Sequence, residues 1–181
     1  YYKNSLHGIL KESDHAILGF LSSRYGNDGY YQLLGTQNKS WEESLPIIRK
    51  ALSQIYKEQP SSGNWGVLLE YPLYRLRKRI DIVVIADFQV FVIEFKVGAK
   101  EVEKTDIRQV EEYALDLRDF HQASHDLPLI PILCCTELSV DDPIQNSSEQ
   151  IKPVRAVSKD GLAGAIVSAY SPSASQYIID W

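Results

Sequence analysis

The stretch KRIDIVVIADFQVFVIEFK, at positions 78–96, decides the fold of this chain. It holds two runs of β-branched and aromatic residues on either side of a short turn at residues 87–89, the pattern of two antiparallel strands joined in a hairpin. Three charged residues, Asp81, Glu94 and Lys96, interrupt these apolar runs. Burying charged groups is costly unless they bind each other or a ligand. We therefore expect a functional site in this hairpin.

Two helices are predicted before the first strand, within residues 13–57. The first has Ser13 at its N-cap and ends near Gly26. The second begins at Ser40, with Glu43 three residues later at the spacing of a capping box. The intervening residues, 27–39, are rich in Gly, Asn and Gln and are predicted to form a loop.

A sheet is predicted within residues 66–157. Its expected strands are residues 67–74, 79–86, 90–97, 129–136 and 154–157, with helices over 103–120 and 161–169 and a polar loop over 137–151. Consecutive strands followed by a strand reached through a helix predict a mixed sheet with helices on both faces. We expect a single α/β domain.

Composition narrows the class of protein. The 181 residues, 44% hydrophobic and 24% charged, are ordinary for one soluble globular domain. The net charge of −5 argues against non-specific coating of nucleic acid but leaves room for a local basic patch. Cys134 and Cys135 are adjacent in an apolar run and are predicted to be core residues on opposite faces of a strand rather than a disulfide, which favours the cytoplasm. No membrane-spanning helix or signal peptide is predicted.

The two ends suggest a fragment. The chain contains no methionine, begins with Tyr1 and Tyr2, and stops in an apolar, helix-compatible run at residues 177–181. We interpret it as a domain cut from a longer protein.

The charged residues of the hairpin have the chemistry of a metal site. Strand parity places Glu94 and Lys96 on one face of their strand, and pairing across the turn brings Asp81 beside Glu94. Two adjacent carboxylates repel each other, and a divalent cation removes the repulsion. Ligands that are all oxygen atoms favour Mg²⁺ or Mn²⁺ over zinc. A lysine one pleat away can orient an attacking water or offset charge on a phosphoryl group.

Asp81 followed by Glu94-Phe95-Lys96 resembles the D…(D/E)-x-K core of the PD-(D/E)XK nuclease superfamily, whose restriction-endonuclease-like fold has the order α-β-β-β-α-β. Gln109 and Tyr113, four residues apart on the next helix, resemble the Q-x-x-x-Y element of its exonuclease-like branch, where these residues face metal and substrate. Position 80 departs from the superfamily name, because isoleucine stands there in place of proline.

The wider sequence resembles the nuclease-like domain that precedes a helicase-type ATPase in some bacterial proteins. The segments that carry this likeness are WEE at 41–43, LEY at 69–71 and DLRDFH at 116–121. The resemblance implies a C-terminal ATPase module in the same chain as partner. Its ATP site would lie outside these residues, which contain no P-loop motif.

The resemblance implies a metal-dependent nuclease acting on DNA in preference to RNA. Asp81 and Glu94 would hold Mg²⁺ or Mn²⁺ with the main-chain carbonyl of Phe95, and Glu70 is a further candidate ligand. Lys96 would position the attacking water or stabilise the transition state. The alternative is a nuclease fold that has lost catalysis and serves as a DNA-binding or docking module. The sequence leaves the oligomeric state open.

A basic cluster lies beside the expected site. Arg75, Arg77, Lys78 and Arg79 fall at the turn between the first two predicted strands of the sheet. Arg77 and Arg79 are candidates to bind substrate phosphates through their guanidinium groups. The alternative is a solvated charge run at a turn.

Other candidate residues also have a structural interpretation. Asp81, Glu94 and Lys96 could form a structural ion pair with a spare acid, and Glu70 could point outward into solvent. Glu43 is interpreted as a helix cap rather than a site residue.

Two further pairs lie on or beside the predicted helix at 103–120. Gln109 and Tyr113 could form a solvated helix face instead of facing the site. His121 and His125, at the end of this helix, are interpreted as capping or surface residues rather than metal ligands.

Overall fold

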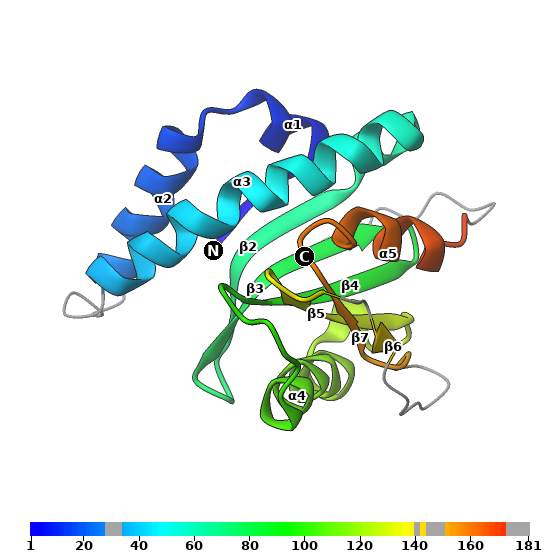
Figure 1. Cartoon of the computed structure of the whole chain (residues 1–181). Helices are drawn as coiled ribbons and strands as arrows, with labels where there is room; N and C mark the ends of the chain where they lie inside the picture. Colours follow the sequence, from blue (N-terminus) through cyan, green and yellow to red (C-terminus); the bar gives the residue numbers. More distant parts are fainter. Residues whose placement is uncertain (28–33, 140–141, 144–150, 173–181) are drawn as a thin grey trace.

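A mixed β-sheet forms the centre of the molecule. The computed structural model describes residues 1–27, 34–139, 142–143 and 151–172, and within these ranges seven strands pair in the order β1-β2-β3-β4-β5-β7-β6 (Figure 1). The strands are β1 (Tyr2–Ser5), β2 (Gly66–Leu73), β3 (Lys78–Ala86), β4 (Gln89–Lys96), β5 (Leu129–Cys135), β6 (Asp142–Pro143) and β7 (Arg155–Val157). The first four are antiparallel, β5 and β7 continue parallel to β4, and β6 is antiparallel to β7.

Helices cover both faces of this sheet (Figure 1). On one face lie α1 (Leu6–Lys11), α2 (Asp14–Asn27), α3 (Leu34–Glu58) and α5 (Leu162–Ala169), and on the other lies α4 (Lys104–Phe120). Short 3-10 helices at Pro60–Asn64 and Gln122–Ser124 complete the described elements. The predicted α/β fold with helices on both faces is confirmed.

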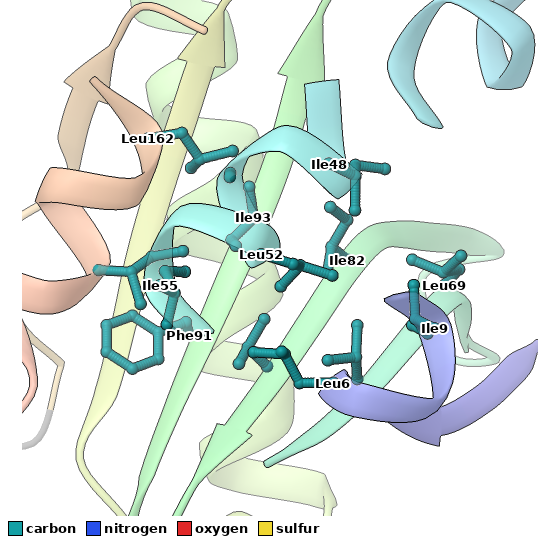
Figure 2. Packing of buried hydrophobic residues seen from close by; sticks show 14 of the residues in the cluster. Leu6, Ile9, Ile48, Leu52, Ile55, Leu69, Ile82, Phe91, Ile93 and Leu162 are labelled. Carbon is teal, nitrogen blue, oxygen red and sulfur yellow. The ribbon is translucent and has the colours of Figure 1, made fainter. Parts of the chain in front are cut away.

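The hairpin of β3 and β4 is apolar throughout because both of its faces are covered. Ile82 and Ile93 pair across the hairpin and belong to the core beneath α3, where they meet Leu52 (Figure 2). The next pair, Val83 and Val92, belongs to the core beneath α4. A strand buried on both faces loses the usual alternation of apolar and polar residues.

The predicted strands and the later helices are confirmed to within one or two residues. Gly98 ends β4 in a left-handed conformation with φ of 76°, which glycine adopts without strain. Cys134 and Cys135 form no disulfide, and they lie in the cores on opposite faces of the sheet, as predicted. None of the described helices is long and apolar enough to cross a membrane.

The predicted start of the second long helix is wrong. α3 begins at Leu34, so Ser40 and Glu43 lie inside it and form no capping box, and Glu43 instead pairs with Lys39 one turn earlier at 3.9 Å. The predicted loop is therefore helical at residues 34–39. Tertiary contacts outweigh the weak helix propensities of this segment, since Asn38 accepts a hydrogen bond from Ser22 of α2 at 2.9 Å.

Two short elements at the N-terminus were not predicted. β1 adds an edge strand to β2, and α1 follows it directly, with Ser5 as N-cap accepting a hydrogen bond from the Gly8 N–H at 3.0 Å. Four-residue and six-residue elements show too little periodicity to be recognised. Within the predicted polar loop, residues 142–143 form β6. Residues 28–33, 140–141, 144–150 and the predicted terminal run at 177–181 lie outside the described residues.

Arg49 joins the three N-terminal helices. From α3 its guanidinium donates hydrogen bonds to the carbonyl oxygens of Ile9, Leu10 and Glu12 at 2.7–3.1 Å, and it pairs with Asp14 of α2 at 3.2 Å. These carbonyls belong to the end of α1, where they have no partners within the helix.

Replacing Arg49 with alanine should lower the free energy of unfolding by about 2–3 kcal/mol, because hydrogen bonds to a charged donor are lost and carbonyls are left unpaired. Urea unfolding at neutral pH measures this through the transition midpoint. The neighbouring Lys50 is the matched control: its ion pair with Asp160 is 70% and 67% exposed, and Lys50→Ala should cost less than about 1 kcal/mol. Equal costs for the two variants would contradict this assignment.

Candidate active site

Three adjacent strands place three carboxylates side by side. The β2–β3 register sets Glu70 opposite Asp81. The β3–β4 register ends at the pair Ile82 and Ile93, and its continuation by one residue sets Asp81 opposite Glu94. Register alone thus brings together the acidic residues of β2, β3 and β4.

Asp81 lies where β3 and β4 separate. Its carboxylate accepts a hydrogen bond from the Phe95 N–H at 2.7 Å. Beyond the last paired residues of β3 and β4, this side chain thus replaces a backbone carbonyl as the acceptor for β4. The Lys96 carbonyl accepts from Thr136 N–H on the side of β5. Because successive carbonyls of a strand point to opposite edges, the Phe95 carbonyl points towards β3 and Asp81. The predicted main-chain ligand therefore lies on the correct edge of its strand.

α4 supplies the partners of Glu94. The Gln109 side-chain amide donates to Glu94 Oε1 at 2.7 Å and to the Tyr113 hydroxyl at 2.6 Å. Lys96 Nζ donates to Gln109 Oε1 at 2.9 Å and lies 3.4 Å from Glu94 Oε1. Tyr113 is only 2% exposed, so the interpretation of Gln109 and Tyr113 as a solvated helix face is wrong.

One oxygen of Glu94 stands out. Glu94 Oε2 is buried and has no hydrogen-bond partner among the described residues, while Oε1 of the same group has two polar neighbours. A buried carboxylate oxygen left unpaired is costly, which favours a proton or a cation at this position. The interpretation of the hairpin as an ion pair with a spare acid requires this oxygen to carry a proton that it shares with Asp81, which agrees with the raised pKa of Glu94.

Asp106, in the first turn of α4, was missed by sequence reasoning. Its carboxylate lies 3.2 Å from Lys96 Nζ, so the lysine sits between Asp106, Glu94 and Gln109. The signal was its position three residues before Gln109, which puts both on one helix face.

Glu70 is held in the site by an unusual backbone. Its φ of 58° is left-handed, a conformation that costs a non-glycine residue about 1–2 kcal/mol, and its side chain accepts a hydrogen bond from Trp41 Nε1 at 2.8 Å. Glu70 is 4% exposed, so its interpretation as an outward, solvated residue is wrong.

The acids form the floor of an open cleft of about 310 Å³ whose rim is basic. Its lining comprises Gln37, Glu70, Arg77, Lys78, Arg79, Asp81, Glu94, Gln109 and Tyr113. The structure thus brings the predicted carboxylates, the helix residues and both candidate phosphate ligands into one cavity. Arg75, the remaining member of the basic cluster, pairs with Asp116 at 3.1 Å and is not part of the lining.

Burial raises the pKa of all three carboxyl groups, to about 6 for Asp81, about 7 for Glu70 and about 9 for Glu94. The charge of Asp81 raises the pKa of its two neighbours further, whereas the Phe95 N–H opposes the rise at Asp81. Burial alone would lower the pKa of Lys96, but the carboxylates beside it raise that pKa above its ordinary value. The raised pKa of Lys96 favours its charged form at neutral pH, and the raised pKa values of the acids disfavour the ionisation of all three together.

The donor set fits a hard divalent cation that retains water ligands. Among the described residues no three His, Cys, Asp or Glu side chains gather closely enough to hold a metal ion by themselves. Asp81 and Glu94 both line the cleft, and the Phe95 carbonyl points to the same strand edge as Asp81; Mg²⁺ commonly binds through one or two carboxylates while keeping several waters. Glu70, hydrogen-bonded to Trp41, lines the same cleft as Asp81 and Glu94.

The two histidines have partners at the end of α4. His121 Nδ1 lies 2.9 Å from Ser124 Oγ, and His125 Nδ1 lies 2.8 Å from the Arg118 carbonyl oxygen. This geometry agrees with their interpretation as residues of a helix end.

Comparison with known proteins adds no assignment, because no protein-family model matches the chain and no curated protein matches it significantly.

The raised carboxyl pKa values make the metal-free protein less stable as the pH rises. The folded state holds these protons above the ordinary carboxyl pKa of about 4, so the free energy of unfolding should fall by several kcal/mol between pH 5 and pH 9 in EDTA. Urea unfolding across this range measures the slope.

Glu94→Gln should remove most of this dependence, because the amide has no proton to release and Glu94 has the largest rise. Glu101→Gln, at an exposed position, should keep the wild-type slope. A slope unchanged in Glu94→Gln would show that Glu94 is not held protonated.

Proposed function

We propose that this domain is a metal-dependent nuclease that hydrolyses phosphodiester bonds of DNA. The observation that carries the proposal is the unpaired, buried Oε2 of Glu94, next to Asp81 on the floor of a cleft with a basic rim. A divalent cation bound at the floor would neutralise the charge of these carboxylates. The basic side chains of the rim would bind the phosphates of a polyanion.

The metal would be held by Asp81, Glu94 and the Phe95 carbonyl. As Mg²⁺ or Mn²⁺, it would polarise the phosphoryl group and lower the pKa of a bound water. Glu70 would accept a hydrogen bond from a water in the outer shell, with Trp41 fixing its carboxylate.

Lys96 would act on the attacking water and on the charge that develops at phosphorus. Glu94, Asp106 and Gln109 hold its ammonium in place, so little reorganisation free energy would be needed when the reaction occurs. Gln109 would also orient the Glu94 carboxylate and, with Tyr113, the outer-shell water or substrate.

Element order supports a restriction-endonuclease-like core. The sequence α3-β2-β3-β4-α4-β5 follows the α-β-β-β-α-β order of the PD-(D/E)XK superfamily, which the motif of Asp81, Glu94 and Lys96 resembles. A cytoplasmic location and an ATPase module in the same chain remain part of this proposal, on the same resemblance.

A second candidate is a DNA-binding or docking module without catalysis. The observation that favours it is the pairing of Lys96 with both Glu94 and Asp106, which compensates part of the acidic charge without a metal. Cleavage assays separate the two functions.

Purified protein with Mg²⁺ or Mn²⁺ should cleave single-stranded or duplex DNA, and EDTA should stop the reaction. Asp81→Asn, Glu94→Gln and Lys96→Ala should each reduce the rate by at least about 100-fold, since each removes a group that acts on the metal or the reacting phosphate. Gel analysis of labelled oligonucleotides measures the rate, and circular dichroism checks that each variant is folded.

Asp160→Asn is the matched control, because Asp160 makes an exposed ion pair on the surface. It should retain the wild-type rate. Wild-type cleavage in all three site variants would refute the mechanism, and a folded wild-type protein that binds DNA without cleaving it would favour the docking module.

A further inference from the structure

The tip of the β2–β3 hairpin exposes an aromatic side chain beside the cleft. The turn runs from Tyr74 to Arg77, whose N–H donates to the Tyr74 carbonyl at 3.3 Å, and Figure 1 shows the hairpin projecting beyond the rest of the sheet. Tyr74 is 87% exposed. A ring so fully exposed contributes little to the core, and its faces are open for stacking.

A second flat surface lies next to this turn. The Arg75 guanidinium lies 3.8 Å from the centroid of the Phe120 ring, and Phe120 is itself 60% exposed. The hydrogen bond from Arg75 Nε to Asp116 at 3.1 Å holds the guanidinium in place over the ring. Arg75 and Phe120 thus form a preassembled stack at the surface.

The cations of the hairpin differ in how far they are neutralised. Arg75 pairs with Asp116, and Lys78 lies 3.7 Å from Glu112. Arg77 makes no ion pair with any of the described residues, and it lines the cleft.

Arg77 closes the turn with a left-handed backbone. Its φ of 52° is left-handed, which glycine would adopt freely and arginine only at a cost. Strained conformations of this kind are concentrated at binding and catalytic sites. A left-handed residue commonly closes a hairpin turn, and here the same residue also lines the cleft.

We propose that Tyr74, Arg75, Arg77 and Phe120, here called the tip surface, bind single-stranded nucleic acid and lead it into the cleft. Unpaired bases would stack on Tyr74 and on the Arg75–Phe120 stack, and Arg77 would bind a phosphate. Only a single strand offers the faces of its bases, because those of a duplex are covered by their neighbours. The positive charge at the rim suits the phosphates of this ligand.

This inference deepens the proposed function and rests on it, because it names a single strand as the substrate of the cleft. Binding and cleavage can nevertheless be tested apart. Binding is measured in EDTA, where no hydrolysis occurs, by fluorescence anisotropy with the 181-residue chain. The probes are a labelled single-stranded DNA of about 12 nucleotides, the RNA of the same sequence and the blunt DNA duplex.

Wild-type protein should bind the DNA single strand more tightly than the duplex. Tyr74→Ala should weaken single-strand binding roughly tenfold, and Tyr74→Phe should stay within about twofold, because the ring and not the hydroxyl provides stacking. Arg77→Gln should weaken binding to all probes and reduce the salt dependence by about one ionic contact. Lys57→Ala, at an exposed position near the end of α3, is the control and should bind as wild type.

Several results would overturn the inference: no single-strand binding by wild type, equal loss on single strand and duplex in Tyr74→Ala, or wild-type affinity in that variant. The RNA probe shows whether the surface discriminates between the two sugars. If single strands bind through Tyr74 but Mg²⁺ yields no cleavage, the inference stands and the nuclease proposal fails. If cleavage occurs and Tyr74→Ala binds single strands normally, the nuclease proposal stands and the inference fails.

Discussion

The energetic constraint at the centre of this structure is the placement of Asp81 beside the buried Glu94 in a sheet covered on both faces. The pairing of β3 and β4 ends one residue before them, and Asp81 takes the N–H of Phe95 that lies beyond this end. Burial raises the pKa of both carboxyl groups, and the charge of Asp81 raises that of Glu94 further. Neighbouring side chains stabilise this pair. Gln109 of α4 donates a hydrogen bond to Glu94, and Lys96 supplies one positive charge.

The arrangement of layers explains why a cleft forms here and not elsewhere along the hairpin. β4 is antiparallel to β3 and parallel to β5, so its C-terminal end meets the connection that leads into α4. The first two turns of that helix bring Asp106 and Gln109 over Lys96. On the other side, α3 brings Trp41 to Glu70. The same segments that bury the central strands therefore close the floor of the site, while the β2–β3 turn leaves its rim basic and open.

The fold and the centre of the site could be predicted because they follow from simple periodicities. Alternation along β3 and β4 put Asp81, Glu94 and Lys96 together, and helical spacing added Gln109 and Tyr113. Glu70 was harder to place, since nothing in the sequence shows that a glutamate will adopt a positive φ and turn towards Trp41. The start of α3 depends on its contacts with α2. The ion pair between Lys96 and Asp106 depends on how α4 packs against the sheet. Both are tertiary effects that local patterns do not encode.

Calorimetric titration with Mn²⁺ at pH 7.5 tests the central claim most directly, because it reports on the metal site without requiring a substrate. We expect binding at one site in the micromolar to millimolar range, with release of about one proton because the metal displaces the proton held by Glu94. Comparing buffers of different ionisation enthalpy measures that proton. Both binding and proton release should be lost in Asp81→Asn and Glu94→Gln. Absence of binding at millimolar Mn²⁺, or unchanged binding in the two variants, would contradict the account.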